Sequence, residues 1–212
     1  MAIELGHKLD GDIIIPLPPP AELATPSIDD LLERESKKLV IGVDPGGNGA
    51  LATIEILTGA ITVIDMPTIK VTVGGTPRLR VDPITLAAWL REKAPYCALA
   101  CVEKAAPRSH DGPGSALNTG AAWGLVVGIL HGLGVPVLDA DPAKWKPSMK
   151  VTADKDTSRA RACLLWPEMA QHFHLKKHDG RAEAVLIAMY GIIRAQKIKH
   201  AAGMLPAAQP KG

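Results

Sequence analysis

Aromatic residues and cysteines are scarce in this sequence of 212 residues. Phe, Tyr and Trp together make up 3% of it, which argues against a surface that binds single-stranded nucleic acid by stacking bases on aromatic rings. Three cysteines give no disulfide framework and fit a reducing compartment. Cys97 and Cys101 lie in an apolar segment, and no second ligand pair has zinc spacing, so we interpret them as buried thiols.

Long apolar runs are also missing. The longest, residues 121–135, contains several glycines and His131 and is shorter than the roughly 20 residues that span a bilayer. It predicts a buried helix. The N-terminus lacks the basic-then-apolar pattern of a secretory signal, and there are no internal repeats. We therefore expect a soluble, cytoplasmic protein.

Charge is unevenly distributed along the chain. Residues 1–36 contain 2 of the 24 basic residues and 8 of the 22 acidic residues. The remainder of the chain therefore has 22 bases and 14 acids, a net charge of +8. A basic folded part favours a polyanionic partner such as nucleic acid. We divide the chain into an acidic, proline-containing and partly disordered extension (1–37), a folded domain (38–196) and a C-terminal tail (197–212).

The hydrophobic pattern of the domain predicts a mixed α/β fold. A buried strand and a hairpin come first, then a polar, basic loop over 67–81, and then helices alternating with two more strands. The predicted strands are 39–43, 50–57, 60–66, 97–103 and 135–138, and the predicted helices cover about 83–93, 115–133, a short stretch from 142, 152–166 and 180–195. This order gives three antiparallel strands joined to helix-covered parallel strands.

Asp44 stands where the first buried strand ends and the glycine-rich turn 45–49 begins. Ligands bind at strand ends in α/β sheets, and glycines allow a substrate to approach the backbone. The alternative is that Asp44 only initiates a turn. Asp82 and Asp141 provide an internal comparison, because both also precede proline but open helices as N-caps. Asp44 leads into a turn and a strand, which favours a function.

Three further acids accompany Asp44. Glu103 ends another apolar strand, although a strand-end acid can be an ordinary edge charge. Asp179 and Glu183 are four residues apart and share one face at a helix start, where acids also complement the helix dipole. Glu183 lies among apolar residues, however, and a buried carboxylate requires a partner.

These four carboxylates together suit Mg²⁺, a hard cation that prefers oxygen ligands. Two such ions roughly 4 Å apart activate a water molecule and stabilise the leaving oxygen of a phosphodiester. Crowded carboxylates are tolerated when a metal neutralises them. The residues therefore predict metal-dependent phosphodiester hydrolysis.

Four segments of the chain resemble motifs of RuvC-type Holliday junction resolvases, especially those of the phage-like branch. They are residues 43–46 with Gly49, the strand ending in Glu103, residues 114–120 with Gly124, and residues 179–184. The resemblance covers roughly residues 38–195. It implies a ribonuclease H-like fold with a five-stranded sheet flanked by helices, and a bacterial or phage-encoded homodimer that cuts branched DNA. It also implies dependence on Mg²⁺, with Mn²⁺ as a substitute. The implied catalytic residues and metal ligands are Asp44, Glu103, Asp179 and Glu183.

One departure concerns the last two acids, which the bacterial pattern places three residues apart rather than four. His178 could assist as a proton shuttle, or it is simply a helix-entry residue. Basic residues border the proposed site in sequence, and similar proteins use cations near the linker before the penultimate helix. We expect phosphate contacts rather than base readout from Lys104, Arg108, Lys150, Lys155 and Lys177.

Two other functions remain open. An actin-like or sugar-kinase-like ATPase has a similar strand order and an Asp-Gly turn, but it needs two lobes and this chain supplies one. A protein that binds branched DNA without cutting it would keep the basic surface. The complete set of acids favours the enzyme.

Overall fold

The computed structural model describes residues 8–9, 13–14, 38–105 and 112–201. Two short strands, β1 (Lys8–Leu9) and β2 (Ile13–Ile14), pair with each other. The rest of the predicted extension and much of the predicted tail lie outside the described residues, as does Arg108.

Five strands form the central sheet. They are β3 (Leu39–Asp44), β4 (Ala50–Glu55), β5 (Ile61–Asp65), β8 (Cys97–Glu103) and β9 (Val137–Ala140). Their spatial order is β5-β4-β3-β8-β9; β3, β4 and β5 are antiparallel, whereas β8 runs parallel to β3 and β9 parallel to β8. The predicted mixed sheet of three antiparallel and two parallel strands is confirmed.

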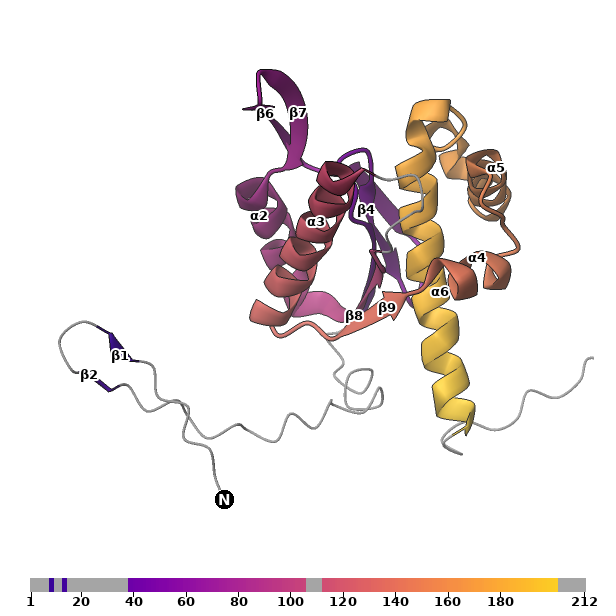
Figure 1. The fold of residues 1–212 in the computed structure, drawn as a ribbon. Coiled ribbons are helices and arrows are strands. Elements are labelled where there is room, and N and C mark those ends of the chain that lie inside the picture. The colour runs from indigo at the N-terminus through magenta and orange to yellow at the C-terminus, as the bar shows by residue number, and fades with distance from the viewer. Residues whose placement is uncertain (1–7, 10–12, 15–37, 106–111, 202–212) are drawn as a thin grey trace, which may run out of the picture.

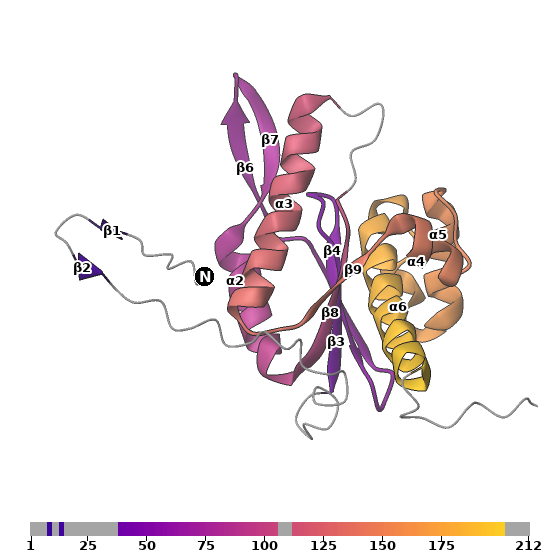
Figure 2. The same ribbon diagram turned by 60° about the horizontal axis from the view of Figure 1, so that its bottom comes forward.

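Helices cover both faces of this sheet (Figures 1 and 2). One face packs against α2 (Pro83–Lys93) and α3 (Pro113–Gly132), and the other against α4 (Pro142–Ser148), α5 (Lys155–Leu165) and α6 (Asp179–Ala201). Three short 3-10 helices complete the described elements: η1 (Ala94–Tyr96), η2 (Pro167–His172) and η3 (Lys176–His178). No helix in the described part of the chain is long and apolar enough to cross a membrane.

The side chains of β3 alternate between two hydrophobic cores because successive strand residues point to opposite faces. Ile41 and Val43 are fully buried on the side of α2 and α3, whereas Val40 packs on the side of α6. Cys97 and Cys101 are both buried, as the sequence predicted.

Gly42 sets the distance between the sheet and α6. A Cβ atom on Gly42 would lie 2.1 Å from the carbonyl oxygen of Ala184 and 2.4 Å from the amide nitrogen of Ala188. Any side chain at this position would therefore push α6 off the sheet. The backbones of β3 and α6 are in direct contact, which fixes the height of the helix above the strand that ends in Asp44.

Asp82 and Asp141 cap helices, as predicted. The carboxylate of Asp82 accepts hydrogen bonds from the first-turn amides of α2, and that of Asp141 accepts one from the amide of Ala143 in α4. Helix α6 is longer than predicted, continuing beyond residue 195 to Ala201.

The prediction of a loop over residues 67–81 was wrong. These residues form an antiparallel hairpin of β6 (Thr68–Val73) and β7 (Thr76–Val81). Its turn is Gly74-Gly75, both at positive φ, which is the conformation that a two-residue hairpin turn requires. Pro77 is tolerated because the two-stranded hairpin has edge positions that need no amide donor.

Candidate active site

Asp44 is the last residue of β3, and a tight turn follows it. The amide of Gly46 donates to Asp44 Oδ1 at 3.4 Å, and the amide of Gly49 donates to the carbonyl of Gly46 at 2.8 Å. A Cβ atom at Gly49 would lie 2.1 Å from the Asp44 carbonyl oxygen. Glycine is therefore required at position 49 for the turn that presents Asp44 at the carboxyl end of the strand.

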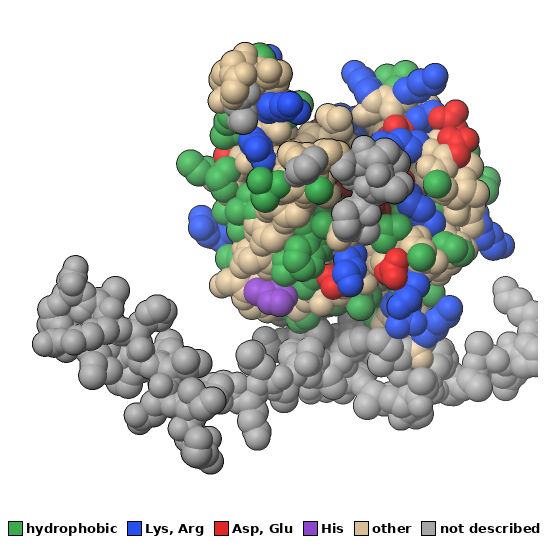
Figure 3. All heavy atoms as spheres, viewed as in Figure 1, with side chains coloured by type: hydrophobic (Ala, Val, Ile, Leu, Met, Phe, Trp, Pro, Cys, Tyr) green, Lys and Arg blue, Asp and Glu red, His purple; other side chains and the backbone are tan. Residues whose placement is uncertain are grey.

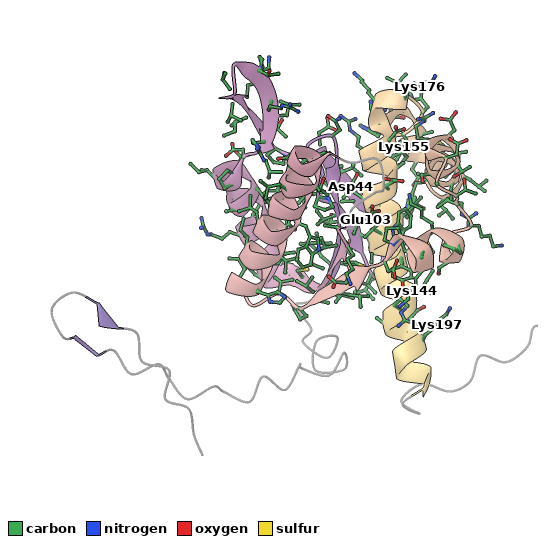
Figure 4. All side chains as sticks on the ribbon, in the orientation of Figure 1. Asp44, Glu103, Lys144, Lys155, Lys176 and Lys197 are labelled. Carbon is green, nitrogen blue, oxygen red and sulfur yellow. The ribbon has the colours of Figure 1, made fainter. Side chains whose placement is uncertain are left out.

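Glu103 ends the neighbouring parallel strand β8. Val43 pairs with Val102, so the register brings Asp44 and Glu103 to adjacent strand ends (Figure 4). The indole Nε1 of the fully buried Trp145 donates to Glu103 Oε2 at 3.0 Å. This hydrogen bond orients one oxygen of the carboxylate.

Glu183 comes from the opposite direction, on the first turns of α6. Its residue is 6% exposed, and its Oε1 accepts from Lys146 Nζ at 2.5 Å and from Ser158 Oγ at 3.5 Å. The same ammonium lies 4.4 Å from the centre of the Trp145 ring. Helix α4 thus contributes one side chain to Glu103 and the next to Glu183.

The start of α6 is held against the Asp44 turn by a second close glycine contact. A Cβ atom on Gly180 would lie 2.6 Å from the carbonyl oxygen of Asn48 and 2.7 Å from the Cα of Gly49. Gly180 therefore allows the helix to begin directly on the turn. Nearby, Arg181 clamps Asp65 at the end of β5 with two hydrogen bonds of 2.6 Å.

Asp44, Glu103 and Glu183 interact electrostatically. Burial, followed by the negative charge of Glu183, raises the pKa of Asp44 from 3.8 to about 6. Burial, followed by the charges of Asp44 and Glu183, raises the pKa of Glu103 from 4.5 to about 7, although Lys146 and the Trp145 hydrogen bond oppose this shift. Three carboxylates from β3, β8 and α6 therefore form one acidic site, in which burial and neighbouring negative charge disfavour the ionisation of Asp44 and of Glu103.

Asp179 has different partners. Arg159 of α5 donates to Asp179 Oδ1, and Lys155 Nζ lies 3.6 Å from its Oδ2. Arg159 also pairs with Asp156 in its own helix. The Asp179 carboxylate is thus held by cations of α5, one helical turn before Glu183.

His178 is buried beside Asp179, and its Nδ1 has no hydrogen-bond partner among the described residues. Burial, with the nearby charges of Arg181 and Lys177, lowers the pKa of His178. The charged groups with the largest effects on it are Arg181, Lys177, His174 and Asp65. This surrounding is typical of a helix-entry residue.

The predicted DNA-binding cations occupy different positions. Lys104 directly follows Glu103 and is exposed, as are Lys150 and Lys177. Lys150 has a positive φ of 60°, and Lys155 is half exposed while it faces Asp179. Arg108 lies outside the described residues. Figure 3 shows basic side chains over the hairpin and over the upper ends of α5 and α6.

Four side chains that contact the acids were not selected from sequence: Trp145, Lys146, Ser158 and Arg159. No role in the site was predicted from the sequence for Trp145 or Lys146. A signal was available for both, since the short helix that Asp141 caps follows directly after the strand next to β8. Any side chain at its start lies near the carboxyl edge of the sheet.

We tested whether these residues fit a divalent metal ion. Within the described residues, no three acidic, histidine or cysteine side chains form a ready-made metal site. Two of the four acids are instead engaged by Lys146 and Arg159. The donor chemistry nevertheless fits, because Asp44, Glu103 and Glu183 are carboxylates, which hard cations prefer. Burial first, and then the charge of neighbouring acids, raises the pKa of Asp44 and of Glu103, and a divalent cation would relieve the repulsion between these acids.

Similarity to known proteins is found in the fold and not in the sequence. No protein-family model matches the sequence, and no curated protein is significantly similar to it. Among solved structures, the yeast mitochondrial Holliday junction resolvase Ydc2 matches with a TM-score of 0.50 and 12% identity, covering 83% of this chain and 87% of its own.

Thermus thermophilus RuvC in complex with a Holliday junction substrate has a TM-score of 0.49 and 16% identity, over 78% of this chain and 96% of that chain. A second Thermus thermophilus RuvC structure gives 0.47 and 18%, over 75% and 96%. The chain has the ribonuclease H-like fold of Ydc2, as that match and the sheet order show.

Proposed function

We propose that this protein is a Mg²⁺-dependent, structure-specific DNA endonuclease that cuts Holliday junctions or other branched DNA. One observation carries the proposal: Asp44, Glu103 and Glu183 lie together at the carboxyl edge of the sheet, where burial, and after it the charge of neighbouring acids, raises the pKa of Asp44 and of Glu103. Such an acidic set is costly without a cation, and phosphodiester hydrolysis is the chemistry that carboxylate-held metal ions support. The shared fold of a Holliday junction resolvase is consistent with it.

Asp44, Glu103 and Glu183 would hold the metal, and Asp179 would join them by exchanging Arg159 for a metal ion. Bound Mg²⁺ would supply an activated water molecule and stabilise the leaving oxygen. Mn²⁺, which accepts the same oxygen ligands, would substitute.

The neighbouring side chains have supporting roles in this proposal. Trp145 keeps one oxygen of Glu103 in place through its indole N–H. Lys146 neutralises Glu183 in the metal-free protein, so its ammonium would move toward the substrate phosphate when Glu183 binds a metal. Lys104, Arg108, Lys150, Lys155 and Lys177 would contact phosphates and position the DNA.

A homodimer suits this substrate. A four-way junction contains two symmetry-related strands to cut, and a two-fold dimer would present one acidic site to each. The membership of the phage-like branch stays a prediction from the sequence motifs.

The decisive test is cleavage of a panel of labelled substrates: a four-way junction, a flap, single-stranded DNA and an RNA–DNA hybrid. We expect the wild type with Mg²⁺ to cut the four-way junction and Asp44→Asn to lose cleavage while it retains binding. Asp141→Asn is the matched control, because this acid also precedes proline but caps α4 and should leave cleavage intact.

Equal cleavage by Asp44→Asn and wild type would refute the assignment. Binding of the junction without cleavage by any metal-loaded form would favour the alternative, a protein that binds branched DNA but does not cut it.

A further inference from the structure

The β6–β7 hairpin is a basic, exposed element that the acidic site does not use. Residues 68–81 contain three cations, Lys70, Arg78 and Arg80, and no acid. Lys70 and Arg78 are exposed and have no ion-pair partner in the described part of the chain. The hairpin also exposes two large apolar side chains, Ile69 at 44% and Leu79 at 42%.

The strand registers place the base of the hairpin at the same sheet edge as the acids. Asp44 pairs with Ala50 of β4, and Ala50 pairs with Asp65 of β5. β6 begins three residues after Asp65, and the amide of Met66 donates to the carbonyl of Gly49 at 2.9 Å. The hairpin therefore starts beside the turn that follows Asp44, and it projects beyond the sheet edge (Figures 1 and 2).

Contacts at the base orient the hairpin. The amide of Asp82 donates to the carbonyl of Pro67 at 2.8 Å and closes the base. Arg80 donates to Asn118 of α3, and a Cβ atom at Gly47 would lie 3.8 Å from Leu79 Cβ. One side of the base is thus tied to α3, and the other meets the Asp44 turn.

Beyond its base, the hairpin displays a cation on each face. Lys70 pairs with Leu79, and the next pair is Val71 with Arg78. Because successive strand residues alternate sides, Lys70 and Arg78 point to opposite faces of the ribbon. A two-stranded ribbon fits the major groove of duplex DNA, and a cation on each face can then reach the phosphates of both groove walls.

We propose that the β6–β7 hairpin binds the phosphate backbone of a duplex arm next to the strand that is cut, with Lys70 and Arg78 as its contacts. This inference rests on the proposed function, because it assumes a DNA substrate at the acidic site. The contacts position the duplex and do not read its sequence, since they go to phosphates. Arg80 is engaged by Asn118 and holds the ribbon at its base.

The test measures binding of the full chain to a fluorescently labelled four-way junction by anisotropy, in EDTA, over a range of NaCl concentrations. Each phosphate contact adds about 0.9 to the slope of log affinity against log salt. Lys70→Ala/Arg78→Ala should therefore lower the slope by about 1.8 and weaken binding by about tenfold or more. Arg78→Lys should retain the wild-type slope, because it keeps the charge.

Lys38→Ala/Arg91→Ala is the matched control. It removes two exposed cations at the opposite end of the sheet, before β3 and late in α2, and should leave the slope unchanged.

An unchanged salt slope in Lys70→Ala/Arg78→Ala, with normal junction binding by the wild type, would overturn the hairpin proposal and leave the nuclease proposal standing. A reduced slope in a protein that cuts no branched substrate would support the hairpin contact and overturn the nuclease. A wild type that binds no DNA would refute both.

Discussion

Asp44→Asn should make the metal-free protein more stable at pH 8, although it removes a group from the proposed active site. The pKa of Asp44 is raised from 3.8 to about 6 by burial and by Glu183. At roughly 1.4 kcal/mol for each pKa unit, the ionised carboxylate lowers the free energy of unfolding by about 3 kcal/mol. The amide has nearly the same shape, carries no charge, and its oxygen can still accept from Gly46.

The pH dependence follows from the direction of the shift. Because the folded-state pKa is the higher one, the folded protein binds more protons between pH 3.8 and about 6, and stability falls as pH rises through that window. Above it the full penalty remains. The stability difference between Asp44→Asn and wild type should therefore be small below pH 3.8 and largest at pH 8.

Urea unfolding in EDTA, followed by circular dichroism at several pH values, measures this difference. Asp82→Asn is the control: hydrogen bonds from Thr85 and Ile84 lower the pKa of Asp82, so its substitution should be neutral or destabilising at pH 8. Added Mg²⁺ should stabilise the wild type more than Asp44→Asn. An Asp44→Asn protein that is less stable than wild type at pH 8 without metal would contradict the reasoning.

Three other substitutions test separate parts of the site. Gly42→Ala should destabilise the protein by about 3 kcal/mol or more, since its Cβ meets the backbone of Ala184; an unchanged urea midpoint would refute the close contact. Trp145→Phe removes a hydrogen bond that lowers the pKa of Glu103, so the pH–rate profile of cleavage should move to higher pH, and an unmoved profile would argue against this role. Lys150→Ala should weaken junction binding and reduce the salt slope by about 0.9. A variant with the same slope as the wild type would show that Lys150 does not contact the DNA.

Strand ends were the part of this protein most accessible from sequence. The continuous apolar runs before Asp44 and Glu103 identified two buried strands, and the structure makes them neighbours. Comparison of three Asp-Pro pairs separated the helix-capping Asp82 and Asp141 from Asp44. The backbone conformation at these positions depends on residues close in sequence, so a short sequence pattern can predict it.

Side-chain partners were less accessible because they depend on packing between distant segments. Trp145 meets Glu103 across 42 positions, and Lys146 meets Glu183 across 37. The sequence shows only that a tryptophan and a lysine follow a capped turn. It does not show that α4 lies beside the carboxyl end of β8, where its tryptophan contacts Glu103.

The hairpin was missed for a different reason. Its cations made residues 67–81 look like a polar loop, although Gly74-Gly75 after a run with four β-branched residues or more is a hairpin signal. Strand patterns are easiest to recognise when one face is buried. The alternation of polar and apolar residues over 68–73 and 76–81 was itself a strand signal, but the polar and basic composition of the segment led to the prediction of a loop.

Helix α6 has a consequence for how the chain acquires its acidic site during synthesis. It contributes Glu183 and also packs on one face of the sheet, with residues 184–188 fully buried. A nascent chain that has not yet emerged past this helix therefore has an uncovered sheet and an incomplete set of acids. The step that completes the hydrophobic core also brings Glu183 to Asp44, so a partly folded chain would lack the complete acidic site.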